Sequence, residues 1–195
     1  MPVVTALRER PRSRVQIELD GGPWRLVPAD AVVRAGLRVC AQLDRATARA
    51  LGRELRRAKA IGVATSALRY RDPSRRSLED RLAGRGVAPA AGAAAIAALE
   101  QAGLVDDARV ASVRAAALAS RGYGDSAIRF DLERRGIGGA LVDAALAGLD
   151  PEPERARAAV ARSGGGPATA RRLASRGFDP GVIEDVLGSP FAADG

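Results

Sequence analysis

The sequence predicts a mainly α-helical protein made of three tandem three-helix repeats, elongated and solenoid-like, behind a small N-terminal region that contains a β-hairpin. The main observation is a motif that occurs three times: leucine, two residues, arginine, glycine and an apolar residue, at 82–87, 132–137 and 173–178. An arginine lies fifteen residues before each motif glycine, and a large aliphatic residue lies ten residues after it. Such self-similarity indicates one small helical unit that is used repeatedly.

The first third of the chain has a different pattern. Residues 14–19 alternate polar and apolar side chains, which is typical of a half-buried strand, and residues 20–23 are turn-forming. Residues 24–27 then predict the returning strand of a hairpin, and residues 3–7 could add a further short strand. A short helix is expected to begin at residues 28–30 and to end at Gly36.

From Asp44 onward the apolar spacing is helical. Each repeat is expected to contain three helices, which end near the early arginine, at the glycine and near the late aliphatic residue. Asp106-Asp107, Asp179-Pro180 and Ala88-Pro89 are typical of helix starts, and the motif glycines suit the left-handed residue after a helix C-terminus. We expect a β-hairpin plus helices in 1–60, repeats in 61–104, 105–149 and 150–189, and a tail in 190–195.

Composition restricts the cellular setting and the partners. The net charge of +8 favours a polyanionic partner, nucleic acid or an acidic protein surface, although a GC-rich genome would produce the same excess of arginine, alanine and glycine. Cys40 is the single cysteine, so no intrachain disulfide is possible and a reducing compartment is expected. The longest uncharged run, 87–99, is too short to span a membrane. We expect a cytoplasmic protein without membrane contact.

Little in the sequence indicates catalysis. The chain has no histidine, which removes the usual general base and the commonest metal ligand. The glycine-rich segment 163–167 lacks the lysine and Ser/Thr of a phosphate loop and is interpreted as a turn. Asp106 and Asp107 could bind a metal ion, but helix capping explains them better. No enzymatic activity, metal or cofactor is expected, although catalysis by carboxylates alone stays open.

The recurring arginines are the best candidates for binding. A cation in the last turn of a helix is stabilised there, which suffices to explain any one of them, but recurrence indicates either a common ancestral unit or a repeated contact. Leu78/Leu82 and Ile128/Leu132 form the buried stripes beside them. Tyr70 and Phe130 are expected in the core or between repeats, and Tyr123 is expected to be more exposed. The predicted binding residues are Arg71, Arg75, Arg76, Arg81, Arg85, Arg121, Tyr123, Arg129, Arg134, Arg135, Arg162, Arg172 and Arg176.

Residues 103–137 resemble the RecX family of recombination regulators. That family typically shows Gly-[Leu/Tyr]-Leu-Asp-Asp-x-Arg-Phe-Ala, then an arginine shortly before a glycine, then Ile-x-x-x-Leu-x-x-Lys/Arg-Gly-Ile. The similarity also includes the N-terminal strand, the Leu-Asp-Gly turn at 19–21, and residues 36–39, 67–70 and 76–82. It covers nearly the whole chain, from about Val3 to Leu187. Two positions differ: Val110 stands for the family's phenylalanine, and Cys40 stands for a glycine.

The resemblance implies a function as well as the repeat fold. It implies a regulator that binds the RecA–DNA filament, inhibits ATP hydrolysis and strand exchange, and so modulates recombination and DNA repair. The partners would be the RecA filament and single-stranded DNA or the DNA within the filament. We expect a monomer that makes its main contact through the second repeat, with Arg121, Tyr123, Arg129, Arg134 and Arg135. Two rival functions are a helix-turn-helix type DNA-binding module and a general α-helical adaptor for another protein.

Overall fold

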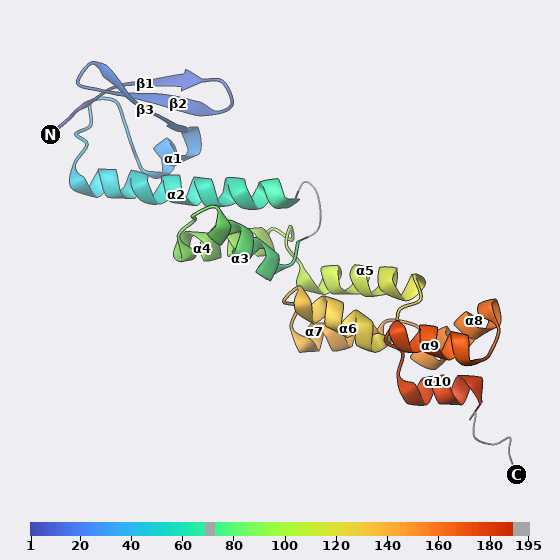
Figure 1. The fold of residues 1–195 in the computed structure, drawn as a ribbon. Helices are drawn as coiled ribbons and strands as arrows, with labels where there is room; N and C mark the ends of the chain where they lie inside the picture. The colour runs from blue at the N-terminus through green and yellow to red at the C-terminus, as the bar shows by residue number, and fades with distance from the viewer. Residues whose placement is uncertain (69–72, 189–195) are drawn as a thin grey trace, which may run out of the picture. The chain divides into compact units, whose positions relative to one another are not determined.

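The computed structural model describes residues 1–68 and 73–188 of the chain (Figure 1). In these residues a small antiparallel sheet and a short helix precede helices that fall into three groups of three, which confirms the predicted mainly helical repeat fold. The chain divides into two compact units. Of the described residues, one unit contains 1–68 and 78–102, and the other contains 73–77 and 103–188.

The N-terminal sheet contains the three predicted strands. They are β1 (Val4–Arg10), β2 (Arg14–Leu19) and β3 (Gly22–Pro28), paired antiparallel in the order β1-β2-β3. The alternation in β2 buries Val15 and Ile17, and these pack with Val4, Val27 and Leu51 into one core. The short helix α1 (Ala29–Arg34) follows β3 and buries Ala31 and Val32 in the same core.

The chain then turns at Cys40, where the sequence departs from the family pattern. Cys40 has a φ of +67°, and its N–H donates a 2.8 Å hydrogen bond to the carbonyl oxygen of Val4 in β1. A left-handed backbone costs a side-chain-bearing residue about 1–2 kcal/mol, which glycine avoids. The glycine of the family pattern is therefore explained by the backbone conformation at this position.

The long helix α2 (Arg45–Leu68) joins the sheet to the first helical group. Asp44 caps its start, because the Asp44 Oδ1 accepts a 2.7 Å hydrogen bond from the Thr47 N–H. Leu51, in the first half of α2, packs into the sheet core, whereas Ala60 and Ala64 are buried in the second half, where α2 contacts α4. The helix is continuous through residues 60 and 61, where the sequence suggested a domain boundary.

The remaining helices follow the predicted order. They are α3 (Arg75–Gly84), α4 (Pro89–Gln101), α5 (Asp107–Ser120), α6 (Asp125–Arg134), α7 (Gly139–Ala147), α8 (Glu152–Ser163), α9 (Pro167–Ser175) and α10 (Pro180–Leu187). Asp106 caps α5 by accepting a 3.0 Å hydrogen bond from the Arg109 N–H, and Asp179 caps α10 in the same manner. A core from α5, α6 and α7 includes Ile128 and Leu132, and a second core from α8, α9 and α10 includes Leu173 and Phe178.

The repeated sequence motif forms the same helix C-terminus three times. In each copy the N–H of the residue after the glycine donates to the carbonyl oxygen of the motif leucine, at 3.0 to 3.2 Å, and the glycine has a φ between +63° and +77°. The leucine and the residue after the glycine are both buried, and this apolar contact accompanies such a helix end. The helix end therefore requires the leucine, the glycine and the final apolar residue. It does not require the arginine, whose side chain can make different contacts in each copy.

The second and third helical groups are joined closely by backbone contacts within one compact unit. The Gly124 N–H donates to the Arg176 carbonyl at 2.9 Å, and the Ser126 N–H donates to the Gly177 carbonyl at 3.2 Å. A side chain at Gly124 would place its Cβ 2.3 Å from the Gly177 oxygen, so only glycine allows this approach. Arg155 of α8 adds hydrogen bonds to Asp125 and to the Tyr123 carbonyl, the latter at 2.8 Å.

The structure corrects two expectations about aromatic residues. Phe130 is 64% exposed and lies outside the core, because it stands about 200° around α6 from the buried Ile128. Tyr123, expected to be more exposed than Phe130, is half-buried and packs against the core of the second helical group. Tyr70 lies outside the described residues. None of the helices in the described ranges is long and apolar enough to cross a membrane.

Candidate functional site

The predicted binding residues are distributed over both compact units. Arg81 and Arg85 belong to the first unit, and the remainder of the described set belongs to the second. Arg71 lies outside the described residues. Arg75 and Arg76 begin α3, and both are exposed; the Arg75 N–H donates a 2.8 Å hydrogen bond to Asp107. The described arginines form separate clusters, each of which lies within one compact unit.

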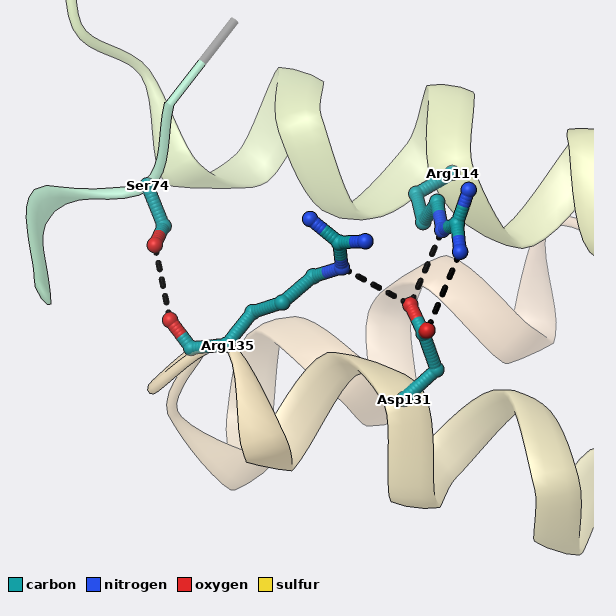
Figure 2. A network of polar contacts seen from close by, with 4 residues as sticks. All are labelled: Ser74, Arg114, Asp131 and Arg135. Atoms are coloured by element: carbon teal, nitrogen blue, oxygen red, sulfur yellow. Dashed lines mark hydrogen bonds and ion pairs between the residues drawn. The ribbon is translucent and has the colours of Figure 1, made fainter. Parts of the chain in front are cut away.

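In the second repeat, the motif arginine belongs to an ion-pair network on α5 and α6 (Figure 2). Asp131 accepts two hydrogen bonds from Arg114, at 2.9 and 3.0 Å, and one from the Arg135 Nε at 2.8 Å. These partners, Arg114 first, lower the pKa of Asp131 from 3.8 to about 2. The Arg135 carbonyl also accepts a 2.7 Å hydrogen bond from the Ser74 hydroxyl. Both the side chain and the backbone of Arg135 therefore make contacts that stabilise the fold.

The other predicted arginines of α6 differ from each other. Arg129 pairs with Asp143 at 2.6 Å and lies 3.9 Å from Glu133, so its charge is already balanced locally. Arg134 is exposed, and no interaction with another described residue engages its side chain. Of the predicted contacts on α6, Arg134 is the one whose guanidinium is available to a partner.

Four predicted arginines converge where the second and third repeats meet. Arg121, Arg162, Arg172 and Arg176 line a hollow of about 340 Å³, together with Ser120, Gly122, Ala159, Ser163 and Leu173. These residues come from the end of α5, the end of α8 and the end of α9. The lining contains no carboxylate, so the positive charges are not neutralised within the hollow. We call this cluster the junction hollow.

Two of these arginines are held in place by the fold. The Arg176 Nη1 donates a 2.5 Å hydrogen bond to the Arg121 carbonyl. The guanidinium groups of Arg121 and Arg176 lie 5.7 and 5.6 Å from the centre of the Tyr123 ring, within cation–π range. Tyr123 therefore contacts two arginines, which occupy at least one face of its ring. Arg162 and Arg172 are exposed and have no ion-pair partner among the described residues.

A second basic hollow lies in the first unit, between α2 and α3. Lys59, Arg81 and Arg85 line it together with Ala58, Gly62, Val63, Ser66, Ala67 and Gly84, and its volume is about 590 Å³. The Lys59 Nζ donates a weak 3.4 Å hydrogen bond to the Gly86 carbonyl. No carboxylate lines this hollow either, so it also suits an anionic group.

Sequence reasoning missed several side chains that shape these sites. Lys59, Ser120 and Ser163 line the hollows, and Arg155 fixes the junction with a side chain that is only 11% exposed. Lys59 lies at helical spacing from the arginines of α2, which the sequence alone could have shown. The partners of Arg155 are 30 and 32 residues away, and no local pattern reveals them. Among the described residues, no three His, Cys, Asp or Glu side chains come together to hold a metal ion.

Comparison with known proteins agrees with the repeat geometry. A family model described as "RecX, second three-helix domain" matches residues 106–146, which contain α5, α6 and most of α7. A solved structure described as "Crystal structure of regulatory protein RecX" is similar with a TM-score of 0.81 and 20% identity, covering 95% of this chain and 98% of that one. RecX from Lactobacillus salivarius is similar over 68% of this chain and 94% of its own, with 18% identity and a TM-score of 0.60.

The curated relatives carry the same name at higher identity. "Regulatory protein RecX" from Xanthomonas axonopodis pv. citri is 33% identical over 142 residues, covering 68% of this chain and 88% of the relative. The protein of that name from Stenotrophomonas maltophilia is 38% identical over 119 residues, covering 56% of this chain and 73% of the relative. The chain belongs to the RecX family of regulatory proteins.

Proposed function

We propose that this chain regulates homologous recombination by binding the RecA–DNA filament, where it inhibits ATP hydrolysis and strand exchange without catalysing a reaction itself. Membership of the RecX family supports a regulator of this type. The observation that carries the proposal is the junction hollow, in which four arginines face no carboxylate. Arginine suits contacts with both phosphate and carboxylate groups, because its planar guanidinium can donate two parallel hydrogen bonds.

Ion pairing within the fold favours some of the predicted contact residues over others. Arg129 and Arg135 of the second repeat are paired with carboxylates. Arg134, Arg162 and Arg172 are exposed and are not engaged by other described side chains. We therefore place the main contact at the junction hollow and at Arg134. The hollow in the first unit would supply a further contact, and linked contacts of modest strength add avidity.

The test is RecA ATP hydrolysis on single-stranded DNA, titrated with the wild-type chain and two double variants. Arg162→Gln with Arg172→Gln removes two charges from the junction hollow. Arg157→Gln with Arg171→Gln removes two exposed charges from the same helices, α8 and α9, outside the hollow. Two partly exposed ionic contacts at about 0.7 kcal/mol each correspond to about a tenfold loss of affinity.

The expected result is inhibition by the wild-type chain at or below the RecA concentration. The half-inhibitory concentration should rise about tenfold for the hollow variant and stay near the wild-type value for the control variant. Unchanged hydrolysis over a wide titration of the wild-type chain would refute the function. Equal inhibition by the two variants would refute the placement of the contact at the junction hollow.

A further inference from the structure

One face of α2 carries a row of arginines that the filament proposal does not use. Arg45, Arg49, Arg53 and Arg56 are all exposed. At 100° per residue they lie within an arc of about 80°, and they extend over about 17 Å of the helix axis. We call these four residues the arginine face of α2. It lies in the first compact unit, whereas the junction hollow lies in the second.

The charges of the arginine face are not neutralised by their surroundings. Within α2 the single carboxylate is Glu54, which lies 3.9 Å from Arg57, about 100° beyond the nearest member of the face. The carboxylate of Asp44, at the start of the helix, accepts the hydrogen bonds of the cap. No described side chain forms an ion pair with any of the four arginines.

The surface beside these arginines is hollowed. Ala48 and Gly52 lie along one edge of the row, and together with the four arginines they line a hollow of about 560 Å³. A Cβ at Gly52 would lie 3.5 Å from the Arg56 Nη1, so the small residue leaves room beside the guanidinium. A chain of anionic groups can therefore approach the helix closely along the row. Lys59 is exposed one turn further along the same helix and continues the positive charge toward the first-unit hollow.

The chemistry of this face distinguishes between possible polyanions. Protein partners are held mainly by desolvated aromatic or aliphatic anchors, and the lining contains no apolar side chain larger than alanine. Single-stranded nucleic acid is bound by aromatic stacking as well as charge, and no aromatic side chain lines the hollow. The phosphate backbone of a duplex can be bound by cationic side chains alone, and its charge density is higher than that of a single strand.

We propose that the arginine face of α2 binds the phosphate backbone of double-stranded DNA without reading its sequence. Each guanidinium neutralises a phosphate and releases a condensed counterion, so the binding is salt-dependent. The helix lies along the backbone and makes no contact with base edges. This differs from a helix-turn-helix module, whose recognition helix enters the major groove. The inference does not depend on RecA, because it concerns DNA binding by the chain alone.

The test uses the full chain and fluorescence anisotropy with a labelled duplex at several salt concentrations. The triple variant Arg49→Gln, Arg53→Gln, Arg56→Gln is compared with Arg10→Gln, Arg25→Gln, Arg38→Gln, which removes three exposed arginines from the same unit outside α2. Both variants have the same net charge. Glutamine and arginine have similar helix propensities, and circular dichroism checks that the helix content is unchanged.

We expect the α2 variant to lose about two to three orders of magnitude in duplex affinity at 0.1 M salt. Its salt slope should fall by about three, because each phosphate contact contributes about 0.9 to that slope. The control variant should retain near wild-type affinity, and two unrelated duplex sequences should behave alike.

Four results would overturn the inference. The first is an equal duplex affinity of the two variants. The others are a loss of affinity of the α2 variant that is confined to single-stranded DNA, one that is confined to one duplex sequence, and one that is seen with polyglutamate but not with DNA. RecA ATP hydrolysis is measured in parallel with the same proteins. A chain that binds duplex through α2 but leaves RecA unaffected supports this inference and refutes the proposed function.

Discussion

Replacing Gly124 by alanine tests the junction between the second and third helical groups. The added Cβ would lie 2.3 to 2.4 Å from the Gly177 carbonyl group and the Phe178 nitrogen. Those atoms belong to backbone, so the clash is relieved only if the two helical groups separate. Separation would break the Gly124 N–H to Arg176 bond of 2.9 Å and the Ser126 N–H to Gly177 bond of 3.2 Å.

The size of the effect follows from these contacts. Two backbone hydrogen bonds contribute about 1 kcal/mol each, and forcing extra volume into a packed contact costs about 1–3 kcal/mol. We expect the free energy of unfolding to fall by about 3 kcal/mol. With a urea slope of about 2 kcal/mol per M, the midpoint should fall by about 1.5 M.

The matched control for this variant is Gly138→Ala. Gly138 is the N-cap of α7, as Gly124 is of α6; both have negative φ, and a Cβ at Gly138 would meet nothing within 4 Å. The control should change the unfolding free energy by less than about 1 kcal/mol. Urea denaturation followed by far-ultraviolet circular dichroism measures both. If Gly124→Ala unfolds at the same urea concentration as Gly138→Ala, the close packing of the junction is refuted.

Two further stability predictions concern single residues. Asp131 has a folded pKa of about 2, below its ordinary 3.8, so its ion pairs stabilise the fold above pH 4 and are lost as the pH falls through 2. Allowing for its partial exposure, Asp131→Asn should remove about 1–2 kcal/mol at pH 7 and flatten acid denaturation between pH 4 and pH 2; an unchanged acid transition would contradict this. Cys40→Gly should raise the unfolding free energy by about 0.5–1 kcal/mol, because it relieves the left-handed backbone at +67°, and a lower urea midpoint would count against that explanation.

The features predictable from the sequence were those fixed by local contacts. The motif leucine, glycine and final apolar residue form a helix end through hydrogen bonds spanning five residues, so three copies of the motif are enough to locate it. The caps at Asp106 and Asp179 are equally local. The strand alternation at 14–19 similarly identifies β2, because its period alone separates the buried face from the exposed one.

What the sequence could not show depends on partners that are distant in the chain. The Arg176 side chain reaches the Arg121 carbonyl, 55 residues away, and Arg155 reaches Asp125, 30 residues away. No spacing rule identifies such pairs. The predicted burial of Phe130 is wrong for a different reason. Its aromatic character favours the core, but its helical phase relative to the buried Ile128 points it toward solvent, and the phase determines its exposure.

The three motif arginines show that a repeated sequence position need not perform a repeated function. Arg85 lines the first-unit hollow, Arg135 pairs with Asp131, and Arg176 anchors the junction hollow. Three equivalent contacts with a regular filament, one for each repeat, would require three equivalent side chains, and these are not equivalent.

Under the proposed function, binding therefore depends on a few unequal basic sites that lie in two different compact units. Linked sites multiply their affinities only when both can be engaged at once. Removing charge from one hollow should then weaken binding by that site's own contribution together with its share of the avidity. The strength of inhibition consequently depends on the arginines that the fold leaves without an ion-pair partner, and not on the number of motif copies.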